Sequence, residues 1–252
     1  MNQRWPDRLW IVRHGESSGN LARDAAQAAR AARIDTLGRD VDVPLSRRGE
    51  AQSAALGRWF ADQAERPDVV LVSPYLRARQ TAGLMAAAGG LAVAPGDFIQ
   101  DERLREKEFG ILDRLTRYGI EEHYPDQAKL RSILGKFYHR PPGGESWCDV
   151  ILRLRGALDT VSLHHAGARV LIVAHQVVVL CLRYLLEQLT EEQILAIDAE
   201  GDVANCGVTA YAYDAGMTPR GGLKLQAYNF TVPLESEGVP VTAESDAPRA
   251  AR

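Results

Sequence analysis

The sequence predicts an α/β fold, a three-layer α/β/α sandwich with a mainly parallel central sheet. Three apolar runs, at 9–12, 68–72 and 170–174, are brief and partly β-branched, which is typical of buried strands. Longer segments of helical composition and spacing separate these runs along the chain. Strands that alternate with helices in this way indicate a sheet that is covered by helices on both faces.

The first half of the chain is expected to start with a strand and an alanine- and arginine-rich helix. Ser46 is suited to cap the amphipathic helix that follows, because a serine hydroxyl accepts from the free amides of a first helical turn. The expected elements are a strand at 9–12, helices at 20–33 and from Ser46 to about residue 64, a strand at 68–72, a helix at 77–88 and a third strand at 91–94.

The second half begins with a charged, irregular segment at 101–110. From Glu235 onward, small, charged and proline residues predict a disordered tail. We therefore expect one catalytic domain at 7–232, followed by the tail at 233–252. The elements expected here are a helix at 120–135 broken at Pro125, a loop at 141–144, a helix at 145–163, a strand at 170–174, a helix at 177–189, and strands at 208–213 and 223–227 that suit a hairpin.

The composition excludes several classes of protein. Apolar residues make up 46% and charged residues 25% of the chain, as in ordinary globular proteins, and a formal net charge of -3 argues against general nucleic-acid binding. No apolar stretch approaches the roughly 18 residues that span a bilayer, and the polar start lacks the apolar region of a signal peptide. Three scattered cysteines suit neither a disulfide framework nor a zinc site. We expect a cytoplasmic protein without metal or other cofactor, bound to neither nucleic acid nor membrane.

Side chains that suit phosphate follow three of the predicted strands. The sequence RHGE at 13–16 follows the first strand, where Gly15 lets the backbone turn sharply. Ser73 and then Arg77 follow the second strand, and His175 follows the most apolar one. In a mainly parallel sheet these strand ends lie at one edge, where ligands bind in open α/β folds. Arginine forks suit phosphate and a neutral imidazole can act as a nucleophile, so the combination predicts a phosphoryl-transfer site.

Six motifs resemble those of the histidine phosphatase superfamily, also called the phosphoglycerate mutase-like superfamily. They occur in the order of that family and lie between about residue 9 and residue 213, and six motifs in order are highly specific. The resemblance implies an enzyme that works through a phosphohistidine intermediate. The motifs are RHGESSGN at 13–20, PLSRRGEAQ at 44–52, SPYLRARQTA at 73–82, LREKEFG at 104–110, PPGGES at 141–146 and VLIVAH at 170–175.

The resemblance also implies a role for individual residues. His14 is expected to be the nucleophile, and Glu106 to donate a proton to the leaving group and then activate water. Glu108 lies in the same segment, and its residue type alone would suit the acid role equally well; the resemblance favours Glu106. The side chains expected to bind the phosphoryl oxygens are Arg13, Arg77, His175 and Asn20.

The superfamily contains both phosphatases and cofactor-dependent mutases. The mutases carry a long insertion between the acid glutamate and the later Gly-Glu-Ser loop, whereas the segment at 110–141 is compact here. This favours a phosphomonoester hydrolase that acts on a small phosphorylated metabolite. Two alternatives stay open, phosphoglycerate mutase-type phosphoryl transfer and a weakly catalytic phosphate-binding or interaction protein. The oligomeric state also stays open, with a homodimer as one option.

Part of the compact segment resembles the fructose-2,6-bisphosphatase branch of the superfamily. Gln176, directly after the second histidine, shares this resemblance. We expect Arg131, Lys136 and Arg140 to form a second basic patch at the mouth of the site, and this patch and Gln176 to bind a second anionic group of the substrate. The alternative is that each of these cations lies on a solvated face of a helix or loop.

Two positions depart from that branch. Leu180 stands where the sugar-bisphosphate enzymes have an arginine for the second phosphate, and Arg117 stands where a tyrosine is expected. These departures put fructose 2,6-bisphosphate itself in doubt, so the sequence leaves the substrate unnamed.

Overall fold

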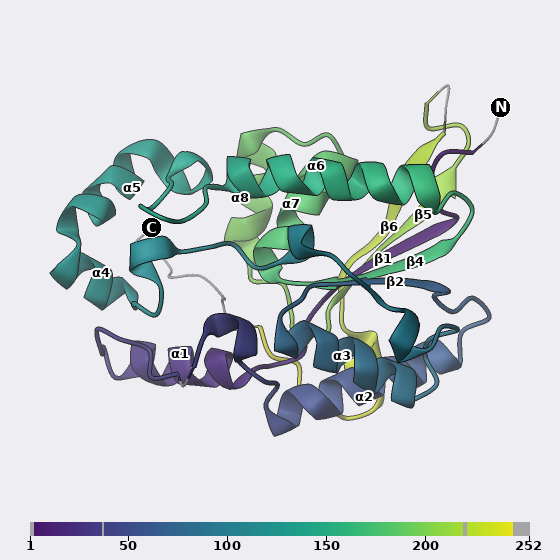
Figure 1. Cartoon of the computed structure of the whole chain (residues 1–252), viewed down its shortest axis with the longest axis horizontal. Helices are drawn as coiled ribbons and strands as arrows, with labels where there is room; N and C mark the ends of the chain where they lie inside the picture. Colours follow the sequence, from purple (N-terminus) through teal and green to yellow (C-terminus); the bar gives the residue numbers. More distant parts are fainter. Residues whose placement is uncertain (1–2, 37, 219–220, 244–252) are drawn as a thin grey trace.

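Within residues 3–36, 38–218 and 221–243, which the computed structural model describes, six strands form one mixed sheet (Figure 1). The strand order is β3-β2-β4-β1-β5-β6. The first four strands in the chain pair in parallel, whereas β5 is antiparallel to β1 and forms an antiparallel hairpin with β6, so a mainly parallel sheet is confirmed. The strands are β1 (Arg8–Arg13), β2 (Val69–Val72), β3 (Ile99–Gln100), β4 (Arg169–Ala174), β5 (Val208–Asp214) and β6 (Gly222–Phe230).

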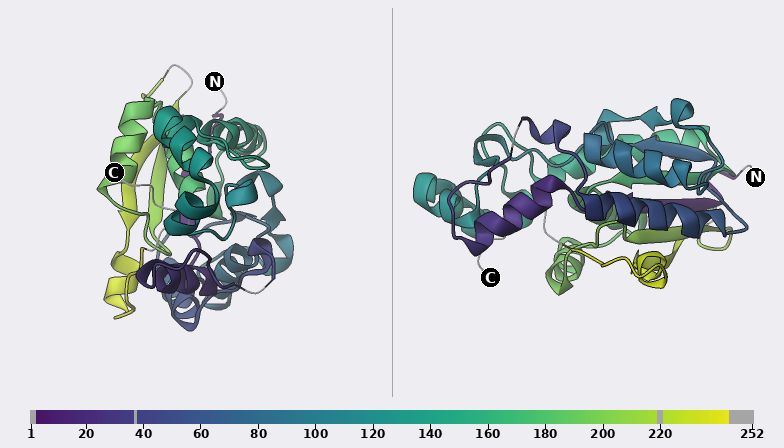
Figure 2. Two further views of the ribbon diagram at one scale, coloured as in Figure 1. Left: turned by 90° about the vertical axis from the view of Figure 1, so that its left-hand side faces the viewer. Right: turned by 90° about the horizontal axis from the view of Figure 1, so that it is seen from below.

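Helices cover both faces of the sheet, as the views in Figures 1 and 2 show. Side chains alternate along β1, so Leu9 and Ile11 pack toward α6 and α7, whereas Trp10 and Val12 pack toward α2 and α3. The expected three layers are therefore confirmed. The helices are α1 (Ser18–Ala28), α2 (Arg47–Ala61), α3 (Leu76–Ala87), α4 (Arg117–His123), α5 (Pro125–Tyr138), α6 (Trp147–His164), α7 (Gln176–Leu186), α8 (Glu191–Glu200) and α9 (Val232–Ser236).

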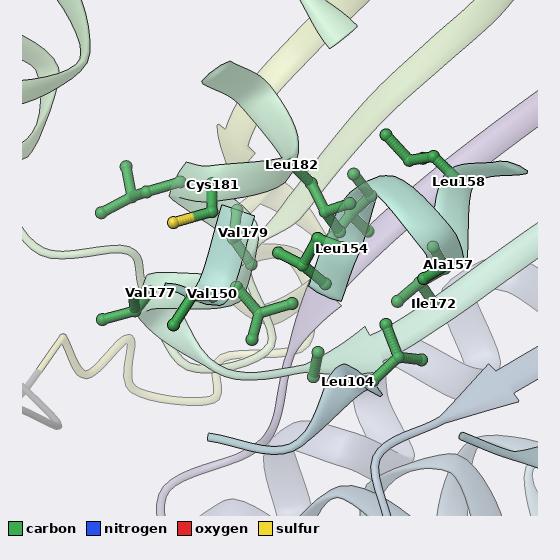
Figure 3. Packing of buried hydrophobic residues seen from close by; sticks show 14 of the residues in the cluster. Leu104, Val150, Leu154, Ala157, Leu158, Ile172, Val177, Val179, Cys181 and Leu182 are labelled. Atoms are coloured by element: carbon green, nitrogen blue, oxygen red, sulfur yellow. The ribbon is translucent and has the colours of Figure 1, made fainter. Parts of the chain in front are cut away.

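The helix α7 is held by an apolar cluster that it shares with α6 and β4 (Figure 3). Residues 176–183 of α7 are all buried, and Leu154 of α6, Ile172 of β4 and Leu182 of α7 lie within this cluster. Complete burial of one large apolar side chain contributes about 1.5–3 kcal/mol to stability. This packing fixes the start of α7, where His175 is the N-cap residue.

The carboxyl ends of β1, β2 and β4 lie level at one edge of the sheet. Val173 of β4 pairs with both Val12 of β1 and Val72 of β2. The residues that follow these strands therefore start side by side. The helices α1, α4 and α5 lie beyond this edge, at the left of Figure 1.

Several sequence predictions about the elements are wrong. The third strand is not at 91–94 but at Ile99–Gln100, because Leu91 and Val93 pack into the cluster on the α2 and α3 face instead of pairing with a strand. The helix expected at 20–33 ends at Ala28, and α8 lies where the sequence predicts no helix. Capping by Ser46 is confirmed, since its side chain accepts from the amide of Gly49.

The segment expected to be a disordered tail is partly packed onto the domain. Residues Val232–Ser236 form α9, and Leu234 is fully buried in the cluster that includes α2 and α3. Further along, Thr242 is buried, and its carbonyl accepts from the amide of Asn205 at 2.8 Å. The expectation of disorder from residue 233 is therefore wrong for 233–243, where local composition is overridden by tertiary contacts. Residues 244–252 lie outside the described residues.

Three further features concern membrane-spanning helices, cysteines and metal-binding groups. No helix in the described parts of the chain is long and apolar enough to cross a membrane. The cysteines Cys148, Cys181 and Cys206 are all free thiols. Across residues 3–36, 38–218 and 221–243, His, Cys, Asp and Glu side chains form no group of three or more that could hold a metal ion.

Candidate active site

The end of β1 places Arg13 and His14 in the interior, where both are fully buried. The amide of His14 donates to the carbonyl of Ala174 at 3.0 Å, which continues the pairing of β1 with β4. A side chain on Gly15 would meet the carbonyl oxygen of Gly49 at 2.5 Å, so glycine is required here by the close approach of α2. The sharp turn that the sequence suggested is thus not the reason for this glycine.

A backbone contact fixes the tautomer of the His14 imidazole. Its Nδ1 lies 2.7 Å from the carbonyl oxygen of Gly15, and a carbonyl oxygen can only accept, so Nδ1 carries the proton. In the neutral ring Nε2 then keeps its lone pair. The Nε of Arg77 donates to this Nε2 at 3.2 Å, which places a guanidinium directly beside the His14 ring.

Arg77 lies at the start of α3, and an acidic side chain holds its guanidinium. Two nitrogens of Arg77 donate to the two carboxylate oxygens of Asp40, each at 3.1 Å, and one donates to the Asp40 carbonyl at 2.8 Å. The same two-point geometry suits a phosphate. Asp40 thus occupies donors of Arg77 that a phosphoryl group would use, and no pattern in the sequence indicates this contact.

His175 faces His14 across the site, with ring centroids 5.1 Å apart. Its Nε2 lies 2.8 Å from the hydroxyl oxygen of Ser73, the residue that follows β2. The ring of Tyr75 packs edge-on against His175 at 5.0 Å. Residues that follow three different strands therefore meet at one point, as the strand-end argument predicts.

Glu106 is buried beside His175. Its Oε2 lies 3.8 Å from Nδ1 of His175, and its Oε1 accepts from the amide of Lys107 at 2.7 Å. The side chain of Glu108 is 48% exposed and accepts from the Tyr75 hydroxyl at 3.2 Å. Glu106 is therefore buried beside His175, whereas Glu108 is partly solvated and lies farther out.

A charged network anchors the irregular segment that carries Glu106. Glu145 accepts from Arg105 at 2.7 Å and from Arg153 at 2.9 Å, and its second oxygen accepts from the amide of Glu108 at 3.1 Å. Burial alone would raise the pKa of Glu145, but hydrogen bonding and the charge of Arg153 outweigh burial and lower it. Arg153 also donates to the carbonyl of Glu106 at 3.3 Å. The sequence did not reveal this network, because its members are far apart in the chain.

A pocket opens from this cluster toward α1 and the loop at 105–114. Asn20, which forms a reciprocal cap with Ser17 at the start of α1, lies on the pocket wall with Arg77 and Glu106. The wall also carries charges of both signs and an aromatic ring, which come from Arg23, Asp40, Phe109, Asp113 and Arg114.

The described lining residues of this pocket do not include the four residues expected to bind a second anion, which are Arg131, Lys136, Arg140 and Gln176. Lys136 pairs with Asp198 at 2.5 Å, and Arg140 donates to the carbonyl of Gly144 at 3.1 Å. Gln176 donates its side-chain amide to Asp202 at 2.7 Å. Arg131 lies half-buried on α5.

The chain belongs to the histidine phosphatase superfamily (branch 1), which matches residues 9–220. It is 31% identical over 188 residues to a 2,3-bisphosphoglycerate-dependent phosphoglycerate mutase of Methylobacterium radiotolerans, covering 74% of this chain and 82% of that protein. It is 29% identical over 188 residues to the mouse 6-phosphofructo-2-kinase/fructose-2,6-bisphosphatase 1, covering 74% of this chain but only 34% of that protein.

Solved structures of the family share the fold. The chain superposes on YhfR of Bacillus stearothermophilus with a TM-score of 0.69 at 25% identity, over 88% of this chain and 96% of YhfR. A mycobacterial glucosyl-3-phosphoglycerate phosphatase, solved with inorganic phosphate, gives a TM-score of 0.65 at 23% identity, over 90% of this chain and 99% of that protein. The family and the fold class that the motifs indicated are confirmed, and the relatives include both mutases and phosphatases.

Proposed function

We propose that the chain is a phosphomonoesterase that works through a phosphohistidine on His14. The observation that carries this proposal is one buried group, in which Arg77 donates to His14, His175 lies opposite His14, and Glu106 lies beside His175. Arg13, Arg77, His175 and Asn20 would bind the phosphoryl oxygens, because cationic and amide donors stabilise charge that builds up in the transition state.

The reaction has two balanced steps. In the first, Nε2 of His14 forms a bond to phosphorus, the ester P–O bond breaks, and protonated Glu106 gives its proton to the leaving oxygen. In the second, water attacks phosphorus and loses a proton to Glu106, the P–N bond breaks, and inorganic phosphate leaves. Both His14 and Glu106 then return to their initial states.

Replacement of His14 tests this proposal directly. We expect wild-type protein to hydrolyse p-nitrophenyl phosphate, and His14→Ala to lose turnover by at least about four orders of magnitude, as loss of a covalent nucleophile does. Denaturing the wild type during turnover should trap a phosphoryl group that is labile to acid and stable to base, as expected of phosphohistidine. Near-normal turnover by His14→Ala would refute the mechanism, and Lys129→Ala on the exposed face of α5 serves as the control.

Mutase activity is the second candidate, because one relative at 31% identity is a phosphoglycerate mutase. A mutase must exclude water while the donor reorients in the site. Here the compact segment at 110–141 forms one 3₁₀ turn at Gly110–Leu112 and the two short helices α4 and α5, which supports hydrolysis. Interconversion of phosphoglycerates on addition of catalytic 2,3-bisphosphoglycerate, at a rate above hydrolysis, would favour the mutase instead.

A further inference from the structure

Tyr75, the N-cap residue of α3, contacts two of the residues proposed to bind phosphate. Its ring packs edge-on against His175 with the ring centroids 5.0 Å apart, and the guanidinium carbon of Arg77 lies 4.9 Å from the Tyr75 ring centroid. The residue is 7% exposed. An edge-on ring pair and a cation over a ring face each favour one relative orientation of the two groups. Tyr75 therefore restricts the orientations of both His175 and Arg77.

The hydroxyl of Tyr75 reaches the irregular segment that carries Glu106. It donates to Oε1 of Glu108 at 3.2 Å. Burial, and then the charge of Glu108, raises the pKa of Tyr75, so the hydroxyl keeps its proton and remains a donor at neutral pH. Because Glu108 follows Glu106 by two residues, one side chain at the end of β2 holds the segment of the proposed acid.

The backbone of Glu108 is held from the opposite side, by the residue that precedes α6 by two positions. Its amide donates to Oε2 of Glu145 at 3.1 Å, and its carbonyl accepts from the amide of Glu145 at 2.9 Å. Oε2 of Glu106 lies 3.8 Å from Nδ1 of His175, the same ring that Tyr75 contacts. The contact from Tyr75 to Glu108 therefore closes a loop of contacts that contains Glu106 and His175.

We propose that Tyr75 and Glu108 form a positioning pair that places Glu106 relative to His175 for proton transfer to the leaving group. The inference rests on the proposed phosphatase function and deepens it, because it concerns the chemical step at the same site. Neither Tyr75 nor Glu108 is among the described residues that line the pocket, so both act through Glu106. Glu108, whose residue type alone suits the acid role, then accepts a hydrogen bond and transfers no proton.

Two esters of similar shape separate misplacement of an acid from a general defect. Phenolate is a poorer leaving group than p-nitrophenolate, so hydrolysis of phenyl phosphate depends more on the acid. We expect Tyr75→Phe to lower kcat on phenyl phosphate by about tenfold, which is part of the roughly 10²- to 10⁴-fold that a general acid contributes. The loss on p-nitrophenyl phosphate should stay below about threefold, with KM for both esters nearly unchanged. Equal losses of kcat on the two esters would overturn the proposal.

Variants of Glu108 distinguish a hydrogen-bond acceptor from an acid. Glu108→Gln keeps an oxygen that accepts from Tyr75 and should retain most of the kcat on phenyl phosphate, whereas Glu108→Leu should lose about tenfold. The double variant Tyr75→Phe, Glu108→Leu should lose no more than either single variant, because both changes remove the same bond. Additive losses in the double variant, or a loss in Glu108→Gln as large as in Glu106→Gln, would refute the pair.

A second tyrosine supplies the matched control. Tyr138 is exposed on α5 and its hydroxyl also interacts with a glutamate, Glu191, so Tyr138→Phe should match the wild type on both esters. The melting temperature of each variant checks its folding, and Glu108→Leu carries the test if Tyr75→Phe is unfolded. If the wild type hydrolyses neither ester, the proposed function fails. If the wild type is active and Tyr75→Phe keeps its full kcat on phenyl phosphate, only the positioning pair fails.

Discussion

At the scale of single residues, the contact between Arg77 and Asp40 stands out. Arg77 is almost fully buried and lies beside His14, yet a carboxylate already binds its guanidinium at two points. In the proposed mechanism a phosphoryl group would use these same donors, so Asp40 would compete with it for Arg77. The side chain of Asp40 is 44% exposed, so it can move into solvent when a substrate arrives.

Removal of the Asp40 charge should therefore strengthen phosphate binding. We expect Asp40→Asn to lower the inhibition constant of inorganic phosphate by about three- to tenfold, because the competing charge-assisted bond becomes weaker. The inhibition constant is measured against p-nitrophenyl phosphate at neutral pH. Asp42→Asn is the control, because Asp42 lies in the same 3₁₀ helix but pairs with Arg39. Weaker phosphate binding in Asp40→Asn would show that Asp40 helps to hold Arg77 in place for the ligand.

At the scale of elements, the irregular segment at 105–110 depends on the helix α6 for its position. Arg153 of α6 donates to the carbonyls of Arg103 and Glu106 and pairs with Glu145. A short segment with few regular backbone hydrogen bonds needs such side-chain contacts to hold one conformation. Arg153 and Glu145 thus hold the segment that carries Glu106, the proposed acid.

Loss of Arg153 should slow the chemical step more than it weakens binding. We expect Arg153→Met to lower kcat by about ten- to a hundredfold with a smaller change in KM, because misplacement of a catalytic acid by a fraction of an ångström reduces proton transfer. Arg155→Met, on the exposed face of the same helix, should behave as wild type. Because a good leaving group needs little acid assistance, p-nitrophenyl phosphate should be affected less than an alkyl phosphate. Equal losses on both esters would point to a general structural defect instead.

At the scale of the whole molecule, the segment after β6 returns to support the catalytic motif. The side chain of Gln52 donates to Thr242 at 2.9 Å and accepts from the amide of Glu16 at 2.9 Å. Asn205 accepts from the Thr242 hydroxyl at 3.0 Å and donates to the carbonyl of His14 at 3.1 Å. Two chains of buried hydrogen bonds therefore join residue 242 to the backbone around His14, the proposed nucleophile.

Truncation tests this connection. A chain that ends after residue 239 leaves Gln52 and Asn205 with unsatisfied buried groups, each of which costs about 1–3 kcal/mol. We expect it to melt several degrees lower and to lose most of its kcat. A chain that ends after residue 243 keeps these contacts and should match the full-length protein in both measurements. If the shorter chain is as active and stable as the longer one, the segment does not support the site.

The sequence predicted most of the strands and the central group of the site for a shared physical reason. Apolar, β-branched runs are driven into the sheet by burial, and the residues after parallel strands must start at one edge. His14, Arg77 and His175 therefore meet, as expected. The strand predicted at 91–94 failed because its apolar side chains were used by helix packing rather than by strand pairing.

The sequence by itself determined the family, the α/β class and the residue types proposed to perform phosphoryl transfer, since these follow from local pattern and from motif order. Only the tertiary structure decided which cations have partners. Lys136 pairs with Asp198 and Arg77 pairs with Asp40, whereas Lys107 has no ionic partner among the described residues. Residues 233–243 pack onto the domain. The physical reason is that the energy of a charge depends on the burial and neighbours that distant segments provide, and no local pattern specifies these.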